Sequence, residues 1–105
     1  MNIYSLQADL CKALAHPIRL QILDLLSERE RTVEELTKLT GSGQSNLSQH
    51  LTALKQQKLV IPRRAGINVY YSLSNRKIAI ACGLIKKLLV ELQESEYRIV
   101  RKMEA

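Results

Sequence analysis

Apolar residues recur at helical spacing through the beginning of the chain. The residues that lie three or four positions apart are Ile3, Leu6, Leu10, Ala13 and Leu14. This spacing predicts a helix over residues 3–15, which His16 and Pro17 interrupt. Pro17 suits the first turn of a second helix that continues to about Ser27. Because this second helix is apolar on most sides, we expect it to lie at the centre of the fold.

Residues 32–57 have the pattern of two short helices joined by a glycine-bearing turn. Thr32 is a suitable N-cap and Glu35 completes a capping box, so we expect a helix over residues 33–39. The run Gly41-Ser42-Gly43 ends this helix, and the next helix opens at the second or third residue of that run. The apolar stripe of that next helix consists of Leu47, Leu51, Ala53 and Leu54.

A basic hairpin is expected directly after these helices, over residues 60–73. Its strands are predicted at residues 60–64 and 69–73, with a turn at Ala65-Gly66-Ile67-Asn68. Two helices followed by a hairpin are typical of a winged helix-turn-helix, in which the second helix enters the major groove of DNA. We therefore expect a single winged-helix domain over residues 1–105 that is mainly α-helical with a small β-hairpin.

A last helix is predicted from Arg76 to about residue 103, and it carries a heptad seam that Glu96 interrupts. The positions of the seam are Ile78, Cys82, Ile85, Leu89, Leu92, Glu96, Ile99 and Met103. So long a helix has more apolar surface than a domain of this size can cover. We therefore expect homodimerisation through residues 76–103, with the first helix, residues 3–15, alongside.

Composition and charge narrow the class of protein. The chain has 105 residues, of which 46% are hydrophobic, and a formal net charge of +6, which fits a polyanionic partner. No apolar run reaches the roughly 18 residues that a membrane-spanning helix needs. The first residues lack a signal-peptide layout, so we expect a cytoplasmic protein with no membrane partner.

The candidate DNA-binding residues are polar side chains of the second short helix and basic side chains around the hairpin. They are Gln44, Ser45, Asn46, Ser48, Gln49, His50, Lys55, Arg63 and Arg64. Amides and hydroxyls can donate to and accept from base edges, and the arginines would meet phosphate or the minor groove. His50 has an alternative role, in which it braces the turn and does not contact a base.

Other readings of this segment are a solvated polar helix, a winged helix used for protein–protein assembly, or one that binds RNA. Assembly modules often lose the basic wing and the polar recognition face, whereas this chain keeps both. A steep salt dependence on duplex DNA, with a preference for one inverted repeat, would separate these readings.

The chain resembles the ArsR/SmtB family of winged-helix repressors over about residues 5–95. The resemblance rests on KALAHPIRLQIL at residues 12–23, QSNLSQHLTAL at residues 44–54, KLV at residues 58–60 and YYSL at residues 70–73. It implies a homodimeric repressor that binds an imperfect inverted repeat of double-stranded DNA and is released by an effector. It also implies a dimer interface made by the first and last helices. The recognition-helix contacts that it implies are Gln44, Ser45, Ser48, Gln49 and His50.

Neither a metal site nor an enzyme site is expected. Many members of the family bind metal through cysteines in a pattern like CVCDL, but residues 32–36 read TVEEL here. Others use Asp and His on the last helix, which contains neither residue type here. The chain also lacks a phosphate-binding glycine loop, a nucleophile elbow and an HExxH motif, so we expect no cofactor and no catalysis.

Two cysteines are a candidate thiol switch. Cys11 lies on the first predicted helix and Cys82 on the last. The resemblance implies that these two helices pack together, which would bring the two sulfur atoms near each other. Relatives that sense persulfide often place the first cysteine after the ALAHPxRL stretch, whereas Cys11 precedes it. The other interpretation is that both are small core residues, since free cysteine is among the most buried residue types. A metal or small-ligand effector is a further alternative.

Overall fold

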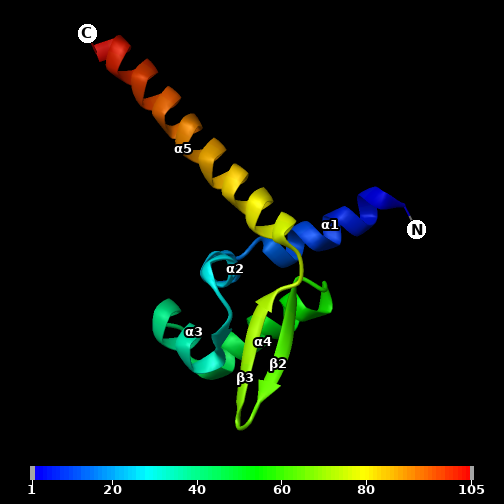
Figure 1. The fold of residues 1–105 in the computed structure, drawn as a ribbon. Coiled ribbons are helices and arrows are strands. Elements are labelled where there is room, and N and C mark those ends of the chain that lie inside the picture. The colour runs from blue at the N-terminus through cyan, green and yellow to red at the C-terminus, as the bar shows by residue number, and fades with distance from the viewer. Residues whose placement is uncertain (1, 105) are drawn as a thin grey trace.

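The computed structural model describes residues 2–104, which form helices around a small sheet (Figure 1). The helices are α1 (Ile3–Leu14), α2 (Pro17–Glu28), α3 (Val33–Thr40), α4 (Gln44–Gln56) and α5 (Arg76–Glu104). The strands are β1 (Arg31–Thr32), β2 (Val60–Ala65) and β3 (Asn68–Leu73). This is the expected winged helix-turn-helix, with α3 and α4 as the helix pair and β2–β3 as the wing.

The helix boundaries follow from local chemistry. Pro17 opens α2, and His16 caps it through Nδ1, which accepts a hydrogen bond from the Ile18 amide at 3.2 Å. The Thr32 hydroxyl accepts from the Glu35 amide at 3.1 Å and the Glu35 carboxylate accepts from the Thr32 amide, which is the predicted capping box. Gly41, with φ of 72°, ends α3 in the left-handed conformation that glycine adopts without strain.

The sheet has three antiparallel strands in the order β1-β3-β2. The pairs Ala65–Asn68 and Val60–Leu73 close the two ends of the hairpin, and its two-residue loop begins at Gly66, with φ of 63°. The turn is therefore two residues long rather than four. Strand β1 pairs with β3 through Thr32 and Tyr70 and was not predicted, because two residues are too few to show the alternation of a strand.

The core lies where α2, α3, α4 and the base of the hairpin meet. Its most deeply buried side chains are Ile22, Leu23, Leu36, Leu47, Leu51 and Leu54. Each such side chain contributes about 1.5–3 kcal/mol by leaving water, so the helix pair is held on a rigid base. Of the apolar stripe predicted for α4, Leu47, Leu51 and Leu54 lie in this core, whereas Ala53 is only partly buried.

Helix α5 projects from the body at the end opposite the tip of the hairpin (Figure 1). Only its first turns pack on the core, through Ile78 and Cys82, and none of its side chains is fully buried. Its other large apolar side chains are about half exposed or more, from Val100 at 46% to Met103 at 80%. Within residues 2–104, no helix is long and apolar enough to span a membrane.

Candidate DNA-binding surface

The outer face of α4 is polar and exposed. It is made by Gln44, Ser45, Ser48 and Gln49, all predicted as base contacts, together with Thr52. Thr52 was not predicted because threonine has no distinctive base-reading pattern. Its hydroxyl donates to the Ser48 carbonyl at 2.9 Å. Asn46 lies toward the flank of the helix, and its amide donates to Ser42 Oγ at 3.2 Å.

The start of α4 offers backbone donors. Gly43 is its N-cap and supplies no side-chain hydrogen bond, so the amides of Gln44, Ser45 and Asn46 have no capping partner. Such amides, together with the positive end of the helix dipole, favour a phosphate group. The residues that could read bases and the groups that could anchor the backbone of a duplex therefore share one end of one helix.

The structure corrects the prediction that His50 is a base contact, because His50 does not lie on this outer face. Its side chain is buried, with 6% of its surface exposed, and Nδ1 accepts a hydrogen bond from Arg19 Nε at 3.1 Å. The residue follows Leu47 by three positions and precedes Leu54 by four, so it belongs to the apolar stripe. A buried imidazole is not placed to contact a base. Its contacts are with Arg19 and His16, so the bracing of the turn before α4 stays a prediction.

The two wing arginines lie in different environments. Arg63 binds the carboxylate of Glu30 through Nε, at 3.2 Å, and through Nη2, and its guanidinium lies 4.9 Å from the centre of the Tyr70 ring. The hydrogen bond from Arg63 holds the pKa of Glu30 below its ordinary value. Arg64 points to the opposite side of the strand, where it pairs across the hairpin with Val69. Both arginines are exposed, but Arg63 is engaged by Glu30 and Tyr70, whereas Arg64 forms no salt bridge within residues 2–104.

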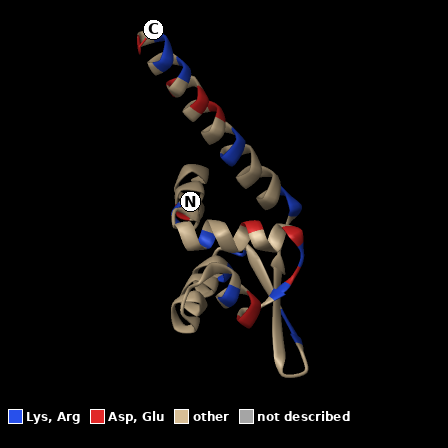
Figure 2. Ribbon diagram, turned by 90° about the vertical axis from the view of Figure 1, so that its left-hand side faces the viewer, with Lys and Arg blue, Asp and Glu red and all other residues tan. Residues whose placement is uncertain are grey.

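Further positive charge lies beside α4. Lys55 and Lys58 are exposed, and among residues 2–104 neither they nor Arg64 form a salt bridge. Carboxylates of the body pair instead with other cations, which are Arg29, Arg31, Lys38, Arg63 and Lys86. Figure 2 shows basic positions on the hairpin, and basic and acidic turns in alternation along α5. Lys55, Lys58 and Arg64 therefore make an unneutralised basic border to α4.

The two cysteines are both reduced and differ in exposure. Cys11 is exposed on α1, whereas Cys82 is partly buried on α5 and packs against the core. Burial raises the pKa of the Cys82 thiol, and the nearby Asp24 carboxylate raises it further, whereas Lys86 acts in the opposite direction. A raised pKa leaves less of the Cys82 thiol in its thiolate form, so burial makes Cys82 a poorer nucleophile. A switch that involves Cys11 and Cys82 stays a prediction.

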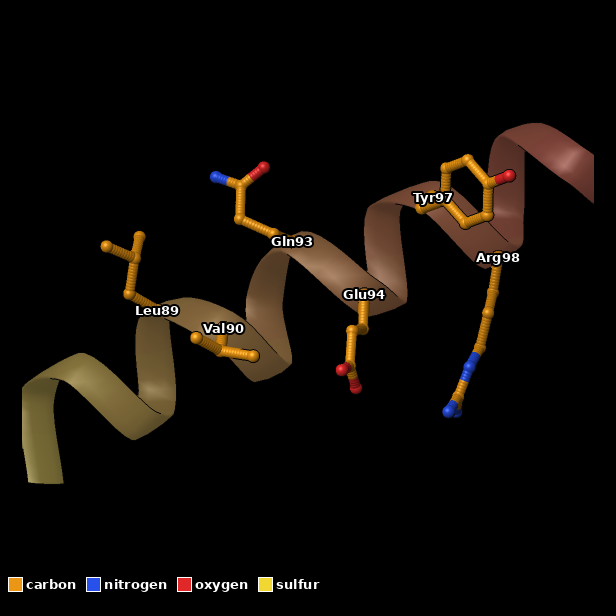
Figure 3. A pocket seen from close by; sticks show the side chains of 6 residues that line it. All are labelled: Leu89, Val90, Gln93, Glu94, Tyr97 and Arg98. Atoms are coloured by element: carbon orange, nitrogen blue, oxygen red, sulfur yellow. The ribbon is translucent and has the colours of Figure 1, made fainter.

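No group of three metal-ligating side chains converges anywhere in residues 2–104. One hollow of the surface lies along α5 alone, and Figure 3 shows the side chains that line it as two rows, with Leu89, Gln93 and Tyr97 in one. The other row is Val90, Glu94 and Arg98. This hollow is the surface of one projecting helix and not an enclosed pocket.

Comparisons with known proteins agree with this geometry. Residues 16–61 match the family described as bacterial regulatory protein, arsR family. The crystal structure of Rv0081 from Mycobacterium tuberculosis, an HTH-type transcriptional regulator, superimposes with a TM-score of 0.84 and 38% identity. That match covers 91% of this chain and 97% of Rv0081.

Two further similarities bear on assembly and regulation. The first is to the homodimeric winged helix-turn-helix DNA-binding domain of Mb0332 from Mycobacterium bovis, with a TM-score of 0.78 and 38% identity. It covers 85% of this chain and 82% of that one. The second is to a transcriptional repressor SmtB homolog from Synechocystis, 36% identical over 89 residues, which are 85% of this chain and 65% of that protein.

Proposed function

The chain belongs to the arsR family of bacterial regulatory proteins, and from this premise we propose that it is a homodimeric transcriptional repressor that binds double-stranded DNA. Members of this family are transcriptional regulators and not enzymes. The observation that carries the proposal is α4. It exposes Gln44, Ser45, Ser48 and Gln49 on a helix whose first amides are uncapped, while its other side is fixed in the core.

The chemistry of this face suits DNA better than another protein. Glutamine can make a bidentate contact with adenine, and serine can pair with several base edges. Lys55, Lys58 and Arg64, which form no salt bridge within the part of the chain that the structure describes, supply the phosphate attraction that dominates nucleic-acid affinity. A surface evolved for protein assembly would have an apolar centre, whereas the outer face of α4 is polar throughout.

The uncovered apolar surface of α5 and α1 supports a homodimer. Ile85, Leu89 and Leu92 on α5 and Ile3 and Leu6 on α1 are exposed, although all are large apolar side chains. So large an apolar surface is typical of an interface. The homodimeric state of the similar Mb0332 domain supports the same assembly. In such a dimer, two copies of α4 would enter successive major grooves about 34–36 Å apart, which requires an inverted repeat.

Footprinting tests this proposal on the DNA that lies directly upstream of the gene. Hydroxyl-radical cleavage of that duplex should show protected patches on one face, separated by about 10 base pairs, one helical turn. Transcription from the same fragment in vitro should fall as the protein is added, which separates a repressor from an activator. Protection of a single patch would contradict the dimer. Uniform protection of every duplex would contradict sequence-specific recognition.

The signal that releases the protein from DNA is tested by comparing redox states. The similar relatives do not assign an effector to this chain, and Cys11 is exposed to oxidants or persulfide. We expect persulfide treatment to weaken binding of the wild-type protein and to leave the Cys11→Ser variant unaffected, if the switch passes through that thiol. Unchanged binding of the treated wild-type protein would leave both cysteines structural and would point to a metal or small ligand.

A further inference from the structure

Three side chains form a junction behind the outer face of α4. His50 on α4 lies next to His16, with ring centres 4.2 Å apart and ring planes inclined by 45°. Arg19 on α2 donates from Nε to His50 Nδ1 at 3.1 Å and from Nη1 to the Ala13 carbonyl, near the end of α1, at 3.3 Å. One guanidinium therefore connects the end of α1, α2 and α4.

The hydrogen bonds show which nitrogen of each ring is the acceptor. Nδ1 of His16 accepts from the Ile18 amide, and Nδ1 of His50 accepts from Arg19, so each neutral ring carries its proton on Nε2. Nε2 of His50 is buried and has no hydrogen-bond partner within residues 2–104. Neither ring thus offers a free lone pair in this state, and a metal ion has no ligand here.

A proton on His50 would break the junction. The ring would lose the acceptor that Arg19 uses and would place a second positive charge beside the guanidinium. The titratable or charged groups that act on the ring are His16 and Arg19, and no carboxylate of residues 2–104 lies within ion-pair distance of it. Burial, followed by His16 and Arg19, lowers the pKa of His50.

We propose that Arg19 and neutral His50 are positioning residues for DNA recognition, because they lock α4 at a fixed angle to the end of α1. His50 directly follows Gln49 and lies two residues after Ser48. A shift in the position of the buried His50 side chain would therefore move both exposed side chains. Because α1 belongs to the proposed dimer surface, the same guanidinium connects the dimer interface with the base-reading helix. This inference rests on the proposed DNA binding, which its test examines separately.

A matched pair of substitutions isolates the acceptor at Nδ1. In His50→Asn, the amide oxygen occupies the place of Nδ1 and can still accept from Arg19, but it cannot be protonated. In His50→Gln, the same amide is one methylene further out, near the place of Nε2, and the acceptor is misplaced. His16→Asn serves as a control, because asparagine keeps the N-cap of α2 and removes the neighbouring ring.

Binding to the upstream duplex is then measured by fluorescence anisotropy at fixed salt and about pH 7.5, well above the ordinary histidine pKa. We expect His50→Asn to bind close to the wild type and His50→Gln to lose about tenfold or more in affinity, the effect of a lost hydrogen bond to a charged group. Equal affinities of the two variants would overturn the proposal. So would a loss in both variants when circular dichroism shows that both are folded.

A double-mutant cycle keeps the proposal testable if His50→Gln folds poorly. Arg19→Lys keeps the charge but cannot reach two acceptors at once, so it should weaken DNA binding as His50→Gln does. The double variant should lose little more than either single variant, because both changes remove one interaction. Additive losses would show that the two residues act independently and would contradict the junction.

Acid gives a second readout with an unambiguous sign. If His50 touched DNA, its protonation would add a phosphate contact and tighten binding, whereas protonation of the junction must weaken it. Because the pKa of His50 is lowered, the wild type should lose affinity relative to His50→Asn, which lacks the titrating ring, as the pH falls below the ordinary histidine range. Tighter binding of the wild type in acid, relative to this variant, would overturn the proposal.

Failure of the proposed function would be recognised separately. If the wild type showed no preference for the upstream duplex, the proposed function would fail, but the junction could still be judged by nitrogen-15 NMR of its imidazoles. His50 should then have a protonated Nε2 and an unprotonated Nδ1. A protonated Nδ1 on His50 would contradict the junction whatever the result with DNA.

Discussion

Gln49 gives the sharpest test of base reading at the scale of a single residue. It is exposed on the outer face of α4, where its amide can make two hydrogen bonds to one base. We expect Gln49→Ala to lose about 1–3 kcal/mol of discrimination between its preferred base and the others. Competition binding with single-base operator variants measures this loss. An unchanged preference at every position would show that Gln49 reads no base.

The wing arginines should differ in their effect on salt dependence. Arg64 is exposed and has no carboxylate partner among residues 2–104, so Arg64→Ala should weaken binding to all duplexes alike and reduce the salt slope by about one. Arg63 is occupied by Glu30, so Arg63→Ala should change the slope less. Equal changes for the two variants would mean that Arg63 leaves Glu30 when DNA binds.

Lys58 has a positive φ, and a substitution there tests the cost of this strained backbone conformation to stability, independently of DNA binding. Lys58 follows α4 with φ of 60°, and its amide donates to the Lys55 carbonyl, while the amide of the next residue, Leu59, donates to the Leu54 carbonyl. A side chain disfavours this left-handed conformation by more than the entropy that a glycine loses on folding, so Lys58→Gly should raise the free energy of unfolding by about 0.5–1 kcal/mol. Lys58→Ala removes the same charge but keeps Cβ, and it should show no such gain in chemical denaturation.

The cysteines should differ in reactivity. Because burial and Asp24 raise the pKa of Cys82, little thiolate is present there near neutral pH, and its alkylation should be slow and should accelerate as the pH rises. Cys11 is exposed and should be alkylated first. Mass spectrometry of the native protein after timed alkylation gives the two rates. Faster modification of Cys82 would favour a reactive thiol on α5.

At the scale of an element, α5 makes the clearest prediction about assembly. Leu92 belongs to the predicted seam, whereas Val90 lies on the other side of the helix, and the two are similarly exposed, at 57% and 52%. Leu92→Glu should therefore dissociate the dimer, because it buries an unpaired charge in the interface. Val90→Glu is the matched control and should remain dimeric in sedimentation analysis. A dimeric Leu92→Glu variant would contradict the seam.

The helices and the hairpin could be predicted from sequence because their signals are local. The capping box at Thr32, the proline at the start of α2 and the glycine of the hairpin turn each act within a few residues. Strand β1 could not be predicted, because its pairing with β3 depends on residues almost forty positions away. The observed element boundaries differ from the predicted ones by a residue or two, because the ends of helices and strands are not sharply defined.

The candidate site was predictable in its residue types and less so in their roles. Gln44 and Gln49 are exposed as a polar face requires. His50 is buried, as its spacing of three positions from Leu47 and four from Leu54 indicates, but its polar side chain led to its prediction as a base contact. The role of His50 depends on Arg19, which lies 31 positions earlier. The role of Arg63 depends on Glu30, which lies 33 positions earlier. Long-range contacts of this kind become visible only when the fold places the elements side by side.

At the scale of the whole molecule, the proposed DNA-binding surface and the proposed dimer surface lie on different parts of the protein. The body presents α4 and the hairpin, while α5 carries its uncovered apolar surface away from the tip of the hairpin (Figure 1). Two copies joined along α5 and α1 would therefore leave both copies of α4 free. This division is the physical reason to expect one dimer to bind one inverted repeat with both recognition helices.

The most direct test of the account is an anisotropy titration of the purified protein on two duplexes at one fixed salt concentration. One duplex comes from directly upstream of the gene, and the other is a shuffled duplex of equal length and composition. The account predicts binding to the upstream duplex that is at least about a thousandfold tighter, with two protein chains per duplex. Equal affinity for the two duplexes, or one chain per duplex at saturation, would contradict a sequence-specific dimeric regulator.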